Sequence, residues 1–75
     1  MSNNKDKPVS YATVMESLPN ALFRVKLDGD ESGNLILSFM SGKMSHNRIR
    51  VVIGDRVMLD NVDLKEMKAR ITRRM

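Results

Sequence analysis

The segment 41–50 carries the side chains of this sequence that are best suited to hold a ligand. Three fixed cations, one imidazole and one amide lie within it: Lys43, Arg48, Arg50, His46 and Asn47. Cations of this kind bind phosphate oxygens, and an amide also hydrogen-bonds a base or a sugar. Met44 and Ile49, five positions apart, are residue types that anchor such a segment on a core. The pattern predicts a phosphate-binding loop, and the competing interpretation is a loop whose cations are merely solvated.

The basic charge of the chain is concentrated in its second half. The 75 residues carry a net charge of +4, with −1 in residues 1–40 and +5 in residues 41–75. This asymmetry is typical of proteins that bind a polyanion, most often a nucleic acid. Four cations near the C-terminus therefore join the candidate site: Lys68, Arg70, Arg73 and Arg74.

Catalytic chemistry is not indicated by these residues. His46 is the single histidine, the chain has no cysteine, and no serine stands in a recognisable nucleophile pattern. The carboxylates of segment 28–34 do not have the spacing of a twelve-residue calcium loop. We therefore expect no enzyme, no metal and no cofactor. No apolar run approaches the roughly 20 residues of a membrane span, and we expect no membrane association.

Five strand-like segments are available to position the candidate residues. They are 9–17, 22–27, 35–40, 56–59 and 68–74. Segment 22–27 alternates most clearly, with Phe23 and Val25 facing inward. Segment 35–40 is apolar on both faces, which predicts a well-covered strand. Segment 60–67 is the hardest to assign, although Asp60 and Asp63 have the spacing that caps a helical turn.

Five short strands, with a helical or irregular excursion between the third and the fourth, predict an all-β, five-stranded OB barrel. An SH3-like barrel is the competing small closed sheet. Residues 1–8 are expected to form a flexible polar tail and residues 9–75 the domain.

The aromatic residues are Tyr11, Phe23 and Phe39, and both phenylalanines fall on inward or two-sided apolar positions. The chain thus has little capacity to stack bases, which favours structured RNA over a flexible single strand as the partner.

Several short motifs, in order, resemble bacterial-type translation initiation factor one. They are Ser17-Leu18-Pro19-Asn20, Phe23-Arg24-Val25, Ser41-Gly42-Lys43-Met44, Ile49-Arg50, Gly54-Asp55 and Arg70-Ile71. The resemblance extends over residues 13–74, and Leu35-Ile36-Leu37 looks equally like plastid-encoded members. The sequence departs from the family pattern at Ala12 and Ala69, where glycine is usual, and in hairpin 28–34, which is about three residues longer.

The resemblance implies a monomeric S1-like OB domain without catalytic activity, in the cytoplasm or a plastid stroma. Such a factor binds the small ribosomal subunit at the aminoacyl-tRNA site through 16S-type rRNA and a ribosomal protein. There it blocks premature tRNA entry and cooperates with initiation factors two and three. Lys43, Asn47, Arg48 and Arg50 fall on the family's RNA-facing loop, and Arg70 falls on its basic last strand. A cold-shock-like RNA chaperone and a small protein-binding barrel are the alternatives.

Overall fold

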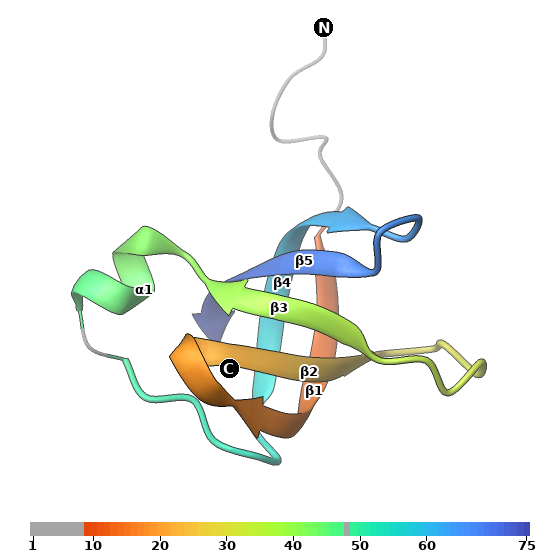
Figure 1. Ribbon diagram of the computed structural model, residues 1–75, viewed down its shortest axis with the longest axis horizontal. Coiled ribbons are helices and arrows are strands. Elements are labelled where there is room, and N and C mark those ends of the chain that lie inside the picture. Colours follow the sequence, from red (N-terminus) through yellow and green to blue (C-terminus); the bar gives the residue numbers. More distant parts are fainter. Residues whose placement is uncertain (1–8, 48) are drawn as a thin grey trace, which may run out of the picture.

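The protein forms one closed barrel, described here by a computed structural model that covers residues 9–47 and 49–75 (Figure 1). The predicted tail, residues 1–8, and Arg48 lie outside the described residues. The elements are β1 (Ser10–Leu18), a 3-10 turn η2 (Pro19–Ala21), β2 (Leu22–Leu27), β3 (Ile36–Met40), α1 (Gly42–His46), β4 (Arg56–Asp63) and β5 (Lys68–Arg74). The predicted strands 22–27 and 68–74 are confirmed with the bounds expected for them.

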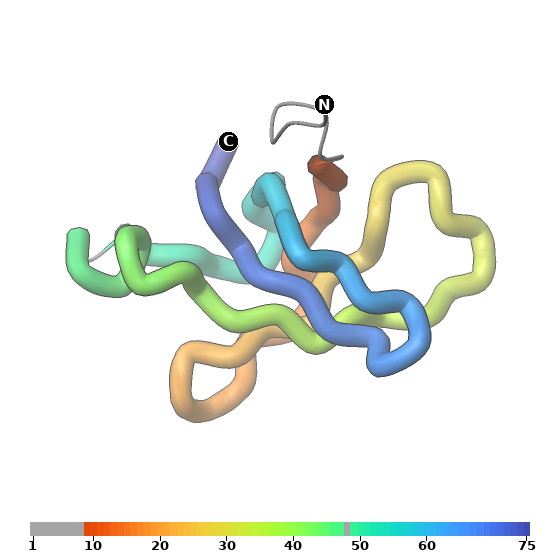
Figure 2. The backbone as a smooth tube through the Cα atoms, turned by 90° about the horizontal axis from the view of Figure 1, so that it is seen from above, coloured from red at the N-terminus to blue at the C-terminus, as the bar shows by residue number. Residues whose placement is uncertain are grey.

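The strand order around the barrel is β1-β2-β3-β5-β4, and β4 pairs again with β1. All pairs are antiparallel except β3 with β5, which run in parallel with Ser38 beside Ala69 and Met40 beside Ile71. Figure 2 shows α1 at one end of the molecule and the loop between β2 and β3 at the other. This order, with one short helix between β3 and β4, confirms the predicted OB barrel.

Inward-facing side chains from all five strands fill the barrel. The fully buried ones include Val14, Val25, Ile36, Val57 and Ile71. Phe23 is also buried, as the alternation in segment 22–27 predicted. Polar Ser38 lies among them, with its hydroxyl 3.5 Å from the carbonyl oxygen of Ile36. Small Ala12 and Ala69 are buried in the same core.

The turns follow the local chemistry of the sequence. Asn20 adopts a positive φ of 65° after Pro19, as an Asn in a tight turn can. Gly54, with φ of 96°, forms the turn before β4, and the Asp55 N–H donates to the Val52 carbonyl at 3.1 Å. That turn is fixed to β1 because the Gly54 N–H donates to the Val14 carbonyl at 2.8 Å.

Two expectations about the second half of the chain were wrong in part. β4 does not end at Leu59 but continues to Asp63. Asn61 takes a positive φ of 51°, and the register with β5 shifts between Asp60 and Asp63, so the strand resumes pairing after the irregularity. Asp60 therefore caps no helical turn. Asp63 does cap a turn, since its carboxylate accepts the N–H groups of Lys65 and Glu66.

The third strand is not covered on both faces as predicted. Ile36 and Ser38 are buried, but Phe39 points outward with 48% of its surface exposed. Apolar residues on both faces suggested a sandwiched strand. Within residues 9–47 and 49–75 no second layer covers Phe39, so this outward apolar residue is exposed.

Phe23→Ala should largely unfold the protein. Removing a buried phenylalanine costs about 3–5 kcal/mol through lost burial and the cavity left behind. A small domain has roughly 5 kcal/mol of stability or somewhat more, so little would remain. Thermal unfolding followed by circular dichroism measures the effect, with exposed Met15→Ala on β1 as the control. A wild-type melting temperature for Phe23→Ala would contradict this account of the core.

Candidate nucleic-acid interface

The basic segment begins where β3 leaves the sheet. The Ser41 N–H donates to the Ile71 carbonyl at 2.8 Å, which is the last contact between β3 and β5. Ser41 then caps α1, because its hydroxyl accepts the N–H of Met44 at 3.3 Å. Met44 is buried in the core and Ile49 packs against it, so both predicted anchors are confirmed. α1 is thus held against the barrel while its polar side chains face solvent.

A hollow lies between α1 and the ends of β4 and β5. Its volume is about 880 Å³ and it is open to solvent. Lys43 and Asn47 line it from the α1 side, and Arg70, Arg73 and Arg74 line it from β5. Apolar side chains complete the lining: Met44, Ile49 and Met58. Segments about thirty residues apart in the sequence therefore contribute to one basic depression with a partly apolar lining.

The structure brings five of the nine predicted site residues together around this hollow. His46 ends α1 and is exposed, and Arg50 is exposed just beyond it. Lys68 is exposed too, but it begins β5 at the end of the strand that lies farther from α1. Arg48 lies outside the described residues.

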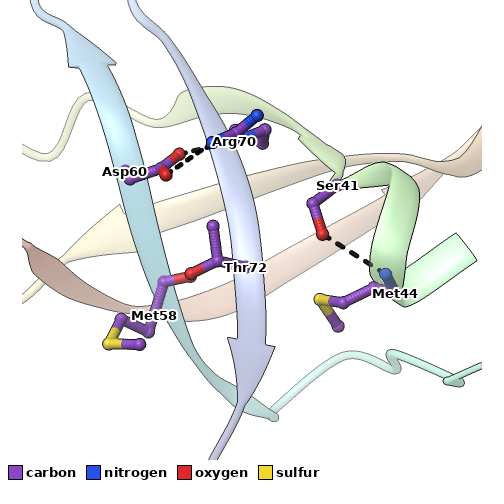
Figure 3. A network of polar contacts seen from close by, with 6 residues as sticks. All are labelled: Ser41, Met44, Met58, Asp60, Arg70 and Thr72. Atoms are coloured by element: carbon purple, nitrogen blue, oxygen red, sulfur yellow. Dashed lines mark hydrogen bonds and ion pairs between the residues drawn. The ribbon is translucent and has the colours of Figure 1, made fainter.

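The cations around the hollow differ in whether their side chains are already bonded to other groups of the protein. Arg70 makes two hydrogen bonds to Asp60 on β4, from Nε at 2.9 Å and from Nη2 at 2.7 Å (Figure 3). These bonds raise the pKa of Arg70 above its ordinary value, so it stays protonated. Arg74 donates from Nη1 to the Arg50 carbonyl at 3.1 Å, which ties the last strand to the basic segment.

Lys43 and Arg73 make no ion pair within the described part of the chain. Both are exposed. They are the side chains of the hollow whose charge is most available to a phosphate.

Sequence reasoning missed Phe39 as a functional candidate. Phe39 lies directly beside Arg70 in the parallel β3–β5 register and beside Leu22 on β2. An exposed aromatic ring next to a guanidinium group is a platform on which a base can stack. The strict alternation of a strand could have revealed this position. If Ile36 and Ser38 face inward, Phe39 must face outward. A serine at position 38 concealed this alternation.

The loop at the opposite end of the molecule is acidic. The β2–β3 loop, residues 28–34, contains three carboxylates and no cation. Asp28, just after β2, pairs with Arg56 of β4 across the intervening strand β1. Hydrogen bonding from the Ser32 backbone and side chain lowers the pKa of Asp30, which therefore stays ionised at neutral pH. This end would repel phosphates and is a poor RNA contact.

No group of three or more potential metal ligands occurs in residues 9–47 and 49–75. Within the same residues no helix is long and apolar enough to span a membrane.

A closed five-stranded barrel with a basic, partly apolar hollow defines a small OB-fold protein of the nucleic-acid-binding type. Residues 2–75 match the family model described as translation initiation factor 1A / IF-1. The chain therefore belongs to this family and is a translation initiation factor of the IF-1 type. The family is not one of enzymes.

Solved structures agree with this assignment. The chain is similar to translation initiation factor one from the Wolbachia endosymbiont strain TRS of Brugia malayi. The sequence identity is 38% over 91% of this chain and 77% of that one, and the TM-score is 0.66. It is also similar to YjeQ from Thermotoga maritima, at 22% identity over 91% of this chain but 23% of that one, with a TM-score of 0.70. The second likeness shows only that the fold is shared.

Lys43→Ala and Arg73→Ala should each weaken RNA binding and reduce its salt dependence. Each unpaired cation that meets a phosphate contributes about 0.7–0.9 to the slope of log K against log salt concentration. Titration of RNA at several salt concentrations, by fluorescence anisotropy, measures the slope. Lys68→Ala is the matched control, because it removes an exposed lysine at the far end of β5. Equal slopes for wild type, Lys43→Ala and Arg73→Ala would mean that the hollow is merely solvated.

Proposed function

We propose that the protein binds the small ribosomal subunit at the aminoacyl-tRNA site through 16S-type rRNA. By occupying that site it blocks premature tRNA entry, in cooperation with initiation factors two and three and in contact with a small-subunit ribosomal protein. Family membership supports the role in initiation. The observation that carries the RNA contact is the hollow between α1 and β5, where cations, an amide and apolar side chains converge.

The hollow is suited to an unstacked nucleotide of a folded RNA. Its volume falls within the roughly 300–1,000 Å³ of typical ligand pockets. Lys43 and Arg73 are placed to neutralise phosphates on either side, while the partly exposed Ile49 and Met58 offer apolar contact to a base. The amide of Asn47 adds a hydrogen-bonding group without charge. Charge alone would attract any polyanion, whereas this combination selects an RNA that presents an extruded base beside its backbone.

Two alternatives make different demands on the surface. A cold-shock-like RNA chaperone needs a track of stacking rings along a single strand. Among the described residues the exposed aromatics are Phe39 on β3 and Tyr11 on β1, which are separated by β2. This arrangement can stack a base on Phe39 but does not form a track. A protein-binding barrel would use exposed apolar residues such as Ile53 and would show no salt-sensitive RNA binding.

Co-sedimentation with purified small ribosomal subunits tests the proposal. The protein should pellet with the subunits, and an excess of an aminoacyl-site ligand should displace it. Binding to subunits that the ligand does not displace would place the protein elsewhere on the ribosome. Stronger binding to short single strands than to subunits would favour the chaperone, and an absence of any RNA binding would favour the protein-binding barrel.

Phe39→Leu should weaken subunit binding without changing its salt slope. Stacking of a base on an aromatic side chain is worth about 1–3 kcal/mol, so a loss of roughly 5-fold to 160-fold is expected. Leucine keeps an apolar side chain of similar size on β3 but has no ring face. Tyr11→Leu on β1 is the matched control and should bind like wild type. If Phe39→Leu also binds like wild type, the ring does not face RNA.

Replacing residues 28–34 by Asn-Gly should leave subunit binding intact. The loop lies at the end away from α1, and its carboxylates disfavour phosphate contact. The Asp28–Arg56 pair that is lost is exposed and contributes little to stability. Binding affinity and thermal unfolding of the shortened protein check this. A large loss of affinity in a folded variant would assign the loop a role on the ribosome.

A further inference from the structure

Arg70 is held in one orientation by a carboxylate that lies directly opposite it. Asp60 and Arg70 are cross-strand partners on β4 and β5. Both carboxylate oxygens accept from the guanidinium, at 2.9 Å and 2.7 Å, and Figure 3 shows the two side chains bridging the strands. The Asp60 side chain is 21% exposed and that of Arg70 39%, so water screens this pair less than the other ion pairs of the barrel. A two-point contact of this kind fixes the plane of the guanidinium as well as its position.

This fixed guanidinium lies where two parts of the proposed RNA surface meet, the hollow and the exposed ring of Phe39. Arg70 lines the hollow, and it lies beside exposed Phe39 in the β3–β5 register. The two bonds to Asp60 use Nε and Nη2 and do not use Nη1. Arg70 therefore offers a donor and a flat face at a set place between the hollow and the aromatic ring.

The carboxylate also changes what Arg70 contributes to long-range attraction. Binding to any polyanion is driven by release of condensed counterions, which counts neutralised phosphates and ignores sequence or shape. An arginine whose charge is cancelled by Asp60 adds little to that term. It still gives directed hydrogen bonds and stacking to a ligand with the correct geometry. The pair thus separates recognition by shape from attraction by charge.

We propose that Asp60 is a specificity-determining positioning residue. By neutralising and orienting Arg70, it keeps this arginine from binding phosphates indiscriminately and makes the surface prefer folded RNA over any flexible polyanion. The proposal rests on the proposed function, since it assumes that this surface binds RNA.

The test compares binding to the homopolymer poly(U) with binding to purified small ribosomal subunits. Asp60→Asn keeps the side-chain size and one hydrogen-bond acceptor but releases the charge of Arg70. It should bind poly(U) several-fold more tightly, with a salt slope steeper by about 0.7–0.9, and the ratio of subunit to poly(U) affinity should fall. Asp60→Glu restores a carboxylate and should return the slope toward wild type. Thermal unfolding shows that each variant is folded.

Three further variants isolate the pair from net charge and from folding. Glu16→Gln removes one negative charge from the exposed Arg24–Glu16 pair, away from the hollow, and should change the poly(U) slope less than Asp60→Asn does. Asp60→Asn with Arg70→Gln has the net charge of wild type, so it should keep the wild-type poly(U) slope while losing subunit affinity. Arg70→Lys keeps both charges of the pair but loses the two-point contact, so it should keep a poly(U) slope near wild type while losing subunit affinity.

The outcomes separate this inference from the proposed function. If folded Asp60→Asn keeps the wild-type poly(U) affinity and slope, Asp60 does not mask the charge of Arg70 and the inference is wrong. If folded Arg70→Lys keeps the wild-type subunit affinity, the two-point contact does not position Arg70 for RNA and the inference is also wrong. If Asp60→Asn weakens both RNAs equally in step with a lower melting temperature, the pair is structural only and the inference is also wrong. If wild type does not bind small subunits, the proposed function fails, while the change in poly(U) slope still decides whether Asp60 masks Arg70.

Discussion

The parallel pairing of β3 with β5 is the constraint on which the rest of the molecule depends. The other strand pairs are all antiparallel and by themselves form an open sheet with β3 and β5 at its two edges. The pairing of β3 with β5 joins these edges and closes the barrel. It also decides where the basic residues meet. The last contact, from Ser41 to Ile71, ends immediately before α1 and near the C-terminal arginines. The hollow exists because a closure that is distant in the sequence places two basic segments side by side.

Most of the fold was readable from the sequence, and the site was readable only in part. Alternation predicted β2 and its buried Phe23, and the residue types of Met44 and Ile49 predicted a segment anchored on the core. Local patterns of this kind need no knowledge of the partner strand. The outward position of Phe39 was missed because a buried serine interrupted the alternation. The continuation of β4 was missed because Asn61 interrupts the register and only pairing with β5 restores it.

The state of each cation was the least predictable feature. In the sequence the basic residues of segments 41–50 and 68–74 are equivalent positive charges. In the structure Arg70 is bound to a carboxylate, Arg74 supports a backbone carbonyl, and Lys43 extends into solvent without an ion pair to the described residues. These differences arise from cross-strand neighbours such as Asp60, which sequence patterns do not identify. A count of charges therefore identifies a surface that can bind a polyanion. It does not show which cations attract the polyanion at long range and which make directed hydrogen bonds to it.

The stability of the barrel and the geometry of the hollow are coupled through α1. A helix of five residues is far shorter than the roughly 12–15 residues at which isolated helices become even marginal in water. It persists because Met44 is buried in the core and because Ser41 belongs at once to the β3–β5 contact and to the helix cap. A substitution that loosens the end of β3 or β5 should therefore displace Lys43 and Asn47 before it unfolds the barrel. Loss of RNA affinity then precedes loss of fold, and measurements of binding and stability in the same variants are needed to tell a contact residue from a support.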